Sequence, residues 1–201
     1  MIKNYIFDFG NVIAKFCPDD LTACYVSDPH QRRIVSDVVF DRLYWAKLDE
    51  GSITDDEVKK QISLRLPEDL REVSCMVYDN WVKNLTPVDG MQKLISDIKK
   101  NDKKLYLLSN ISIGFANNYK NVTWLKEIFS KFDGLVFSGP IGMVKPNKNI
   151  FEFILEKFEL NSDECIFVDD CVMNINGAEN AGIKGYFFDG DSEKLRKFLQ
   201  M

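Results

Sequence analysis

Histidine, basic blocks and regularly spaced cysteines are scarce in this 201-residue sequence. The five cysteines are odd in number and lack CxxC spacing, which indicates reduced thiols in a cytoplasmic protein. The single histidine, His30, follows Pro29 in a polar stretch without a second base or metal ligand nearby, which favours a surface position. No long block of lysine and arginine is present, so nucleic-acid binding is not indicated.

Long apolar segments are missing too. No run approaches the length that spans a membrane, and the N-terminus lacks the layout of a signal peptide. Hydrophobic residues still make up 45% of the chain, and the net charge of −5 is spread along it. This composition supports one sizeable domain with a small insertion. We therefore expect a cytoplasmic monomer or homodimer that binds neither membranes nor nucleic acid.

Residues 5–12 contain the feature around which the predicted fold is arranged. Three apolar residues run directly into Asp8, and Gly10 and Asn11 follow. A continuous apolar run is typical of a strand covered on both faces, as in a parallel sheet. Asp8 is then expected at the end of that strand, beside a loop with free backbone N–H groups. A carboxylate there is costly unless a cation compensates it, so the sequence should supply a metal site and a lysine elsewhere.

A helical block is predicted over residues 15–86, with no strand inside it. Apolar residues at helical spacing over 34–43, with a stop at Gly51, predict one helix. A capping box beginning at Thr54 predicts the start of a second helix. The spacing over residues 70–85 predicts a third.

The second half of the sequence alternates between strand and helix. Buried strands are predicted at 105–108, 135–137, 165–168 and 186–188. Such alternation predicts right-handed crossovers and a parallel sheet, which binds ligands at the carboxyl ends of its strands. The fold class is therefore α/β, a Rossmann-like parallel sheet with an inserted all-helical cap. The expected division is a core of residues 1–14 and 87–201 and a cap of residues 15–86.

Four polar features lie where this fold would bring them together. Singly, each has an ordinary explanation. An aspartate after a strand can cap a helix, Ser109 and Asn110 can form a turn, and Lys145 can be an exposed lysine before Pro146. Together they supply a carboxylate, a hydroxyl, a lysine and a carboxylate pair in order, three of them at the ends of predicted strands. That combination predicts a shared site.

These motifs resemble those of the haloacid dehalogenase-like (HAD) hydrolase superfamily, helical-cap subclass. Asp8 in Asp-x-Gly-Asn-Val matches the nucleophile motif, Ser109 the phosphate-holding hydroxyl, and Lys145 the lysine motif. Asp169 and Asp170, within Asp-Asp-x-x-x-Asn, match the acidic metal motif. The resemblance covers essentially the whole chain and is nearest to the alpha-glucose-1-phosphate phosphatase-like branch. It implies a phosphatase of small phosphorylated metabolites, with sugar phosphates expected first.

The resemblance also implies roles for individual residues. Asp8 and Lys145 are the expected catalytic residues. The expected phosphate-binding residues are Phe9, Gly10, Asn11, Ser109, Asn110 and Lys145. The expected ligands of Mg²⁺ are Asp8, Gly10 and Asp170, with Asp169 and Asn174 as second choices.

Electrostatics agrees with these roles. Two unit charges about 4 Å apart repel by about 4 kcal/mol at an effective dielectric near 20, so a carboxylate and a phosphate ester need a cation between them. A divalent ion neutralises both, and magnesium suits a site made of oxygen ligands. The expected reaction is transfer of the phosphoryl group to Asp8 and hydrolysis of the aspartyl-phosphate by water.

One position departs from the pattern of many phosphatases in this superfamily. The residue two after the nucleophile is usually an aspartate that acts as general acid and base, and here it is Gly10. Asp19 and Asp20 are candidates to replace it, although a solvated acidic turn explains them as well. Two alternatives follow from the gap: dehalogenation or phosphonate cleavage on the same fold, or a non-catalytic phosphate-binding module.

Overall fold

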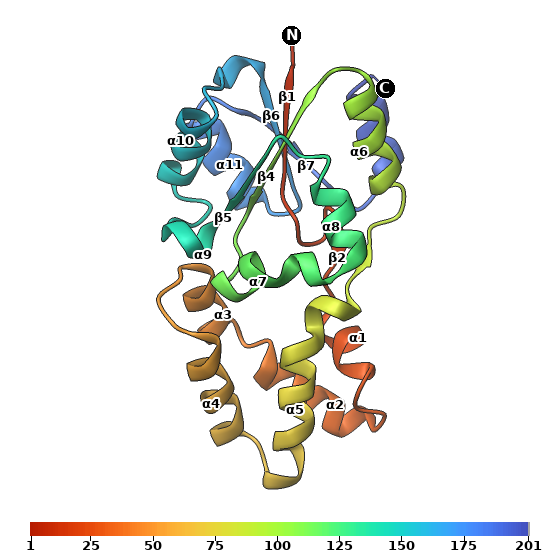
Figure 1. The fold of residues 1–201 in the computed structure, drawn as a ribbon, viewed down its shortest axis with the longest axis vertical. Helices are drawn as coiled ribbons and strands as arrows, with labels where there is room; N and C mark the ends of the chain where they lie inside the picture. Colours follow the sequence, from red (N-terminus) through yellow and green to blue (C-terminus); the bar gives the residue numbers. More distant parts are fainter. Residues whose placement is uncertain (201) are drawn as a thin grey trace.

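Five parallel strands form the central sheet, in the order β5-β4-β1-β6-β7. The computed structural model describes residues 1–200, and Figure 1 shows the sheet in the lobe that carries both termini. The strands are Asn4–Phe7 (β1), Lys104–Ser109 (β4), Gly134–Phe137 (β5), Cys165–Asp169 (β6) and Lys184–Phe187 (β7). The predicted parallel sheet is thus confirmed, with β1 at its centre.

Helices cover both faces of this sheet. Along β1, Phe7 belongs to one apolar cluster and Ile6 to the other, and both are 0% exposed. The cluster of Phe7 includes residues of α6 (Met91–Lys100), α8 (Thr123–Phe129) and α12 (Ser192–Phe198). The cluster of Ile6 includes residues of α10 (Lys148–Lys157) and α11 (Val172–Asn180). Burial on two faces explains why the strand sequences are continuously apolar.

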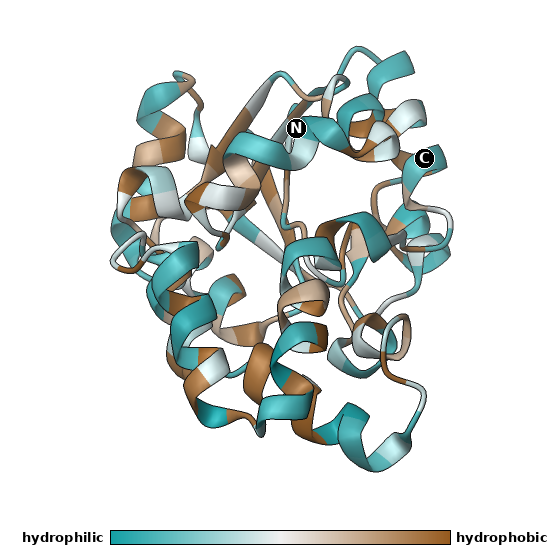
Figure 2. Cartoon of the chain, turned by 60° about the horizontal axis from the view of Figure 1, so that its bottom comes forward, coloured by the Kyte–Doolittle hydropathy of each residue, from teal (hydrophilic) through white to brown (hydrophobic). Residues whose placement is uncertain are grey.

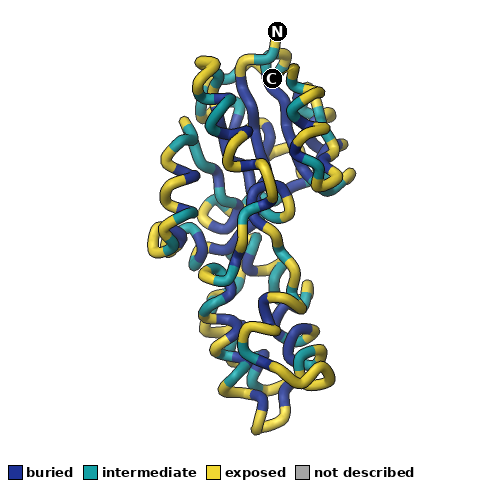
Figure 3. The backbone as a smooth tube through the Cα atoms, turned by 90° about the vertical axis from the view of Figure 1, so that its right-hand side faces the viewer, coloured by how far each residue is buried: buried dark blue, intermediate teal, exposed yellow. Residues whose placement is uncertain are grey.

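Helices alone make up the second lobe, which lies at the opposite end of the molecule from the termini (Figures 1 and 3). They are α1 (Pro18–Ala23), α2 (Pro29–Val39), α3 (Arg42–Asp49), α4 (Asp55–Arg65), α5 (Glu68–Asn80) and the 3-10 turn η1 (Trp81–Asn84). Apolar segments alternate with hydrophilic ones along these helices (Figure 2), as expected where one face is buried. This lobe is called the cap below.

A short antiparallel ribbon joins the lobes. It pairs β2 (Ala14–Lys15) with β3 (Thr86–Pro87). The predicted boundaries, after residue 14 and before residue 87, fall within this ribbon. The division into two domains stays a prediction. No helix among residues 1–200 has the length and apolarity needed to cross a membrane.

The predicted cap helices need two corrections. Residues 34–51 form two helices rather than one, because the chain leaves the helix at Phe40 and Asp41 starts α3, its side chain accepting a hydrogen bond from the Leu43 N–H at 2.8 Å. A single capping side chain can interrupt a helix while the apolar spacing of the sequence continues unchanged. The third helix ends at Asn80, and η1 follows. The capping box at Thr54 is confirmed.

Several short helices were not predicted. They are α1, α7 (Ile113–Asn118), η2 (Tyr119–Asn121), α8, α9 (Ser138–Ile141) and η3 (Ser162–Glu164). Most are one or two turns long, and α7 contains glycine and asparagine, which favour helices weakly. Elements of this length form because they pack on the core, so sequence periodicity does not reveal them.

Candidate active site

Lys145 connects two aspartates at the carboxyl end of the sheet. Its Nζ lies 2.7 Å from Asp8 Oδ1 and 2.7 Å from Asp169 Oδ2. The pairing of β1 with β6 places Phe7 opposite Val168, so the next residues, Asp8 and Asp169, leave the sheet side by side. The lysine side chain is 1% exposed. A lysine buried so deeply is stable as a cation only because both carboxylates contact it.

Burial and charge act in opposite directions on these groups. Burial raises the pKa of Asp8 to about 7, although the Lys145 ammonium opposes the shift. Burial also disfavours the charge on Lys145, but the two carboxylates outweigh it and hold the lysine pKa above its usual value. Buried charged groups with strongly shifted pKa values are typical of functional sites, so this cluster is a candidate.

The acidic cluster fits a divalent cation. Asp8, Asp169 and Asp170 each bring a carboxylate oxygen within 4.8 Å of the others. Three carboxylates and one ammonium leave two uncompensated negative charges when all are ionised. Burial raises the pKa of Asp170 as well, so no nearby group fully compensates its charge. Carboxylate oxygens at this spacing and charge are suitable ligands for Mg²⁺.

Asp169 has other partners besides a possible cation. Its Oδ1 accepts a hydrogen bond from the Cys171 N–H at 2.7 Å, and Asn174 Nδ2 donates to both its oxygens at 3.2 and 3.0 Å. With Lys145 on Oδ2, the carboxylate is well supplied with donors. The structure therefore places the second-choice metal ligands, Asp169 and Asn174, in a network that orients Lys145. Asp170, which is half-buried, has more room for a cation.

Asn110 also supports Lys145. Its Nδ2 donates to the Lys145 carbonyl at 2.9 Å, and its Oδ1 accepts from the Lys145 N–H at 2.8 Å. Both ends of the amide are thus occupied by one backbone segment. The predicted contact of Asn110 with phosphate stays a prediction. Ser109 is the last residue of β4, is 2% exposed, and lies one strand away from the Asp8 loop.

The loop after Asp8 folds back on itself. Asn11 has a positive φ of 54°, and its N–H donates to the Ala14 carbonyl at 2.7 Å. Its side chain accepts a hydrogen bond from the Phe16 N–H at 3.0 Å and donates to Asp170 Oδ2 at 3.1 Å. Asn11 thus ties the loop to the metal motif. Phe9 is buried and packs on Phe115, with ring centroids 5.0 Å apart.

Sequence reasoning missed one acidic residue of the cap, Asp49. It is the last residue of α3 and is half-buried. Burial raises its pKa to about 7, and the charges of Asp8 and Lys145 both act on it. Asp49 is thus a cap carboxyl group whose pKa depends on charges of the acidic cluster. Its position two residues before Gly51 was the only signal in the sequence.

The acidic residues suggested in place of Gly10 lie elsewhere. Asp19 and Asp20 are in the first turn of α1 and are exposed. Asp19 lies 3.7 Å from Arg32, and its side chain is 62% exposed. The exposure of both residues fits a solvated acidic turn rather than a catalytic pair.

Aromatic rings connect the cap to the core. Trp45 packs on Trp81 with ring centroids 5.1 Å apart, and Trp81 stacks on Phe115 of α7 at 5.9 Å. Beside this contact is a cleft of about 390 Å³ between the lobes. Its lining combines polar and apolar side chains and comprises Asp55, Lys59, Tyr78, Asp79, Trp81, Val82, Lys83, Ser112, Gly114, Phe115, Asn118, Asn121 and Val122.

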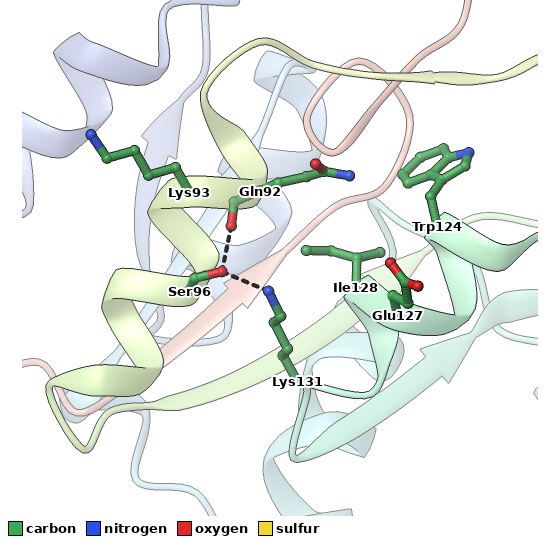
Figure 4. A pocket seen from close by; sticks show the side chains of 7 residues that line it. All are labelled: Gln92, Lys93, Ser96, Trp124, Glu127, Ile128 and Lys131. Carbon is green, nitrogen blue, oxygen red and sulfur yellow. Dashed lines mark hydrogen bonds between the residues drawn. The ribbon is translucent and has the colours of Figure 1, made fainter.

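A second hollow lies between α6 and α8, away from the acidic cluster (Figure 4). Its lining residues are Gln92, Lys93, Ser96, Trp124, Glu127, Ile128 and Lys131. Lys131 crosses it and donates to Ser96 Oγ at 2.6 Å. The hollow contains none of the predicted site residues, and its lysines are not held against carboxylates as Lys145 is. The cleft between the lobes contains none of the predicted site residues either. The acidic cluster is the candidate active site because its carboxylates and Lys145 converge there.

Comparisons with known proteins identify the family of the chain. A family model described as haloacid dehalogenase-like hydrolase matches residues 2–182. The chain is 27% identical over 195 residues to the D-ribitol-5-phosphate phosphatase of Bacteroides thetaiotaomicron, covering 92% of this chain and 91% of that protein. It is 24% identical over 183 residues to the sesquiterpene phosphatase astK of Aspergillus oryzae, covering 91% and 88%.

Solved structures share the fold. A HAD family enzyme from Bacteroides thetaiotaomicron, crystallised with magnesium and inorganic phosphate, superimposes with a TM-score of 0.74. The match covers 97% of this chain and 99% of that one at 21% sequence identity. An L-2-haloacid dehalogenase from Xanthobacter autotrophicus has a TM-score of 0.69 at 17% identity, covering 100% and 83%. At these identities the likeness establishes the architecture alone.

Proposed function

The chain belongs to the haloacid dehalogenase-like hydrolase family, and we propose that it is a magnesium-dependent phosphomonoester hydrolase acting through an aspartyl-phosphate on Asp8. The observation that carries the proposal is the buried group of Asp8, Lys145 and Asp169, with Asp170 beside it. Its uncompensated negative charge favours a metal-dependent reaction. A dehalogenase has no need for such a cation.

Each side chain then has a task in the reaction. One carboxylate oxygen of Asp8 attacks phosphorus, and the Lys145 ammonium, 2.7 Å from Asp8 Oδ1, holds that carboxylate and offsets phosphate charge. Asp169 and Asn110 fix the two ends of the lysine, side chain and backbone. Ser109 and the loop N–H groups are proposed to hold phosphate oxygens. Magnesium bound by Asp8, Asp170 and the Gly10 carbonyl would supply charge neutralisation.

We propose a small phosphorylated metabolite as the substrate, with sugar or polyol phosphates first. The relatives named above include a ribitol-5-phosphate phosphatase and a sesquiterpene phosphatase, so polar and apolar alcohols both occur among them. The cleft between the lobes supports the polar class, since charged and amide side chains line it together with Trp81 and Phe115. The aromatic cluster at the same junction supports an apolar class as the second candidate.

A phosphate-release panel tests the proposal. Sugar phosphates, polyol phosphates and an isoprenoid monophosphate are incubated with the wild type and Asp8→Asn, with magnesium and with excess chelator. We expect phosphate release only by the wild type, and only when magnesium is present. Asp89→Asn is the matched control, because Asp89 is a carboxylate with 93% of its side chain exposed.

Each alternative gives a different result in the same panel. Equal release by wild type and Asp8→Asn would contradict the proposal. Halide release from 2-haloacids that persists in chelator would favour dehalogenation. Tight binding of a phosphate ester by calorimetry, without product, would favour the non-catalytic module.

A further inference from the structure

The position two residues after the nucleophile is open. A Cβ built on Gly10 would meet no atom within 4 Å. Neighbouring atoms therefore do not exclude a side chain at this position. The loop therefore leaves space beside Asp8 where the leaving-group oxygen of a phosphate ester would have no acid from the core. If the proposed function is right, a proton donor must reach this space from another element.

Asp49 ends α3 where this helix of the cap meets the core. The loop after it is pressed against the core: a Cβ on Gly51 would lie 2.3 Å from the Gly139 carbonyl oxygen, and Gly139 in turn donates its N–H to the Ile111 carbonyl at 3.0 Å. Ile111 follows Ser109 and Asn110 at the carboxyl end of β4. The C-terminal end of α3 therefore docks on the edge of the sheet that carries the site, as the neighbouring positions of α3 and α9 in Figure 1 indicate.

The charged groups around Asp49 come from both lobes. Arg42 lies at the other end of α3 and Glu50 follows Asp49, while Asp8 and Lys145 belong to the core. Within residues 1–200, no lysine, arginine or histidine forms an ion pair with the Asp49 carboxylate, in contrast to Asp41 on the same element, which Arg65 contacts at 2.7 Å. Burial is the main cause of its raised pKa, and the negative charge of Asp8 adds to it.

We propose that Asp49 is the general acid that protonates the leaving oxygen, in the place left by Gly10. This inference depends on the proposed phosphatase activity. In the first step an Asp8 oxygen bonds to phosphorus, the bond from phosphorus to the ester oxygen breaks, and the Asp49 proton passes to that oxygen. In the second step water bonds to phosphorus, the bond to Asp8 breaks, and a water proton returns to Asp49. A carboxyl group that gives up a proton in the first step and takes one back in the second can make both transfers.

The dependence on the leaving group tests the proposal. Asp49→Asn keeps the size of the side chain and removes the acid. We expect kcat/KM to fall about 10²–10⁴-fold for an alkyl phosphate, whose leaving oxygen needs a proton, and to stay within about threefold for p-nitrophenyl phosphate, whose leaving group departs as an anion. Because kcat/KM reports the steps through departure of the leaving group, slow hydrolysis of the aspartyl-phosphate does not disturb the comparison.

Controls separate catalysis from structure. Glu50→Gln removes a carboxylate from the next residue, which is exposed, and should leave both substrates unchanged. Gly10→Asp in the Asp49→Asn background should restore the alkyl phosphate reaction. An equal loss on both substrates, or no loss on either, would overturn the role of Asp49 while the active wild type kept the phosphatase proposal. A wild type that releases no phosphate would overturn both.

Discussion

At the scale of single residues, most contacts of the site fix the position of Lys145. Asp8 and Asp169 contact its ammonium, and Asn110 contacts its backbone on both sides. Asn174 in turn donates to both oxygens of Asp169. In the proposed reaction the lysine meets phosphate with little reorganisation, which is the usual advantage of a preorganised charge.

Asn174→Leu tests this network. The substitution keeps roughly the volume and removes the donor, so the buried Asp169 carboxylate loses its side-chain amide partner. We expect the free energy of unfolding to fall by about 1–3 kcal/mol, measured by urea denaturation, together with a lower kcat. Met173→Leu is the control, because that side chain is 65% exposed and should change stability by about 0.5 kcal/mol or less. An Asn174→Leu protein as stable and active as the control would contradict the network.

At the scale of elements, α3 is the helix on which the cap's contribution to the site depends. Its start is fixed by Asp41, which accepts from the Leu43 N–H at 2.8 Å and contacts Arg65 at 2.7 Å. Its end carries Asp49, and Gly51, with a φ of +69°, turns the chain immediately afterwards. Because the helix is short, loss of the Asp41 hydrogen bond at its N-terminus should weaken the whole helix.

Asp41→Ala should lower the free energy of unfolding by about 0.5–2 kcal/mol. The effect should depend on pH. The Leu43 N–H and Arg65 hold the pKa of Asp41 below its ordinary value, so the carboxylate stabilises the fold above that ordinary value and the benefit is lost as pH falls through the depressed one. The difference from wild type in urea titrations should therefore shrink in acid.

Asp41→Asn separates the two parts of this effect. Asparagine caps a helix as well as aspartate but cannot form the ion pair with Arg65. Its stability should lie between those of wild type and Asp41→Ala. The difference in stability between Asp41→Asn and Asp41→Ala should change little between neutral and acid pH. An Asp41→Ala deficit that grows in acid would contradict the assignment.

The sequence predicted the sheet better than the site. Continuous apolar runs ending in Asp8, Ser109 and Asp169 identified three adjacent strands, because burial on both faces leaves a simple pattern. The family match and the phosphatases among the relatives confirm the predicted class, a HAD-like phosphatase. The roles of individual site residues stay predictions.

Other features could not be read from the sequence. The break before α3 depends on one hydrogen bond from Asp41. Nothing in the sequence reveals that the Asn110 side chain pairs with the Lys145 backbone. Asp49 became a candidate only when the structure showed the end of α3 docked on the core, and such a long-range contact leaves no local pattern.

At the scale of the whole molecule, the cap rests on the core through close contacts. Gly51 approaches Gly139, and a Cβ on Gly114 would lie 2.3 Å from the Asp55 carboxylate at the start of α4. Trp81 and Phe115 join the two lobes beside these contacts. Function in this arrangement depends on the cap seating fully, because part of the proposed chemistry comes from it.

Gly51→Ala should disturb that seating. The added methyl group would lie 2.3 Å from the Gly139 carbonyl oxygen, and the residue has a positive φ of 69°. Gly190→Ala carries a similar backbone cost at φ +91° but would meet no atom within 4 Å. We expect kcat/KM of Gly51→Ala to fall at least about tenfold below that of Gly190→Ala. Equal kinetics in the two variants would show that this contact is not needed.

The central claim is that Asp8, Asp170 and Lys145 act together around one divalent cation at the edge of the sheet. A crystal structure of the wild type with magnesium and beryllium fluoride, a mimic of the phosphoryl group, tests it most directly. The account predicts the fluoride complex bonded to an Asp8 oxygen, magnesium on Asp8 and Asp170, and Lys145 still in contact with Asp8. Density for either group elsewhere in the molecule, with the acidic cluster empty, would contradict it.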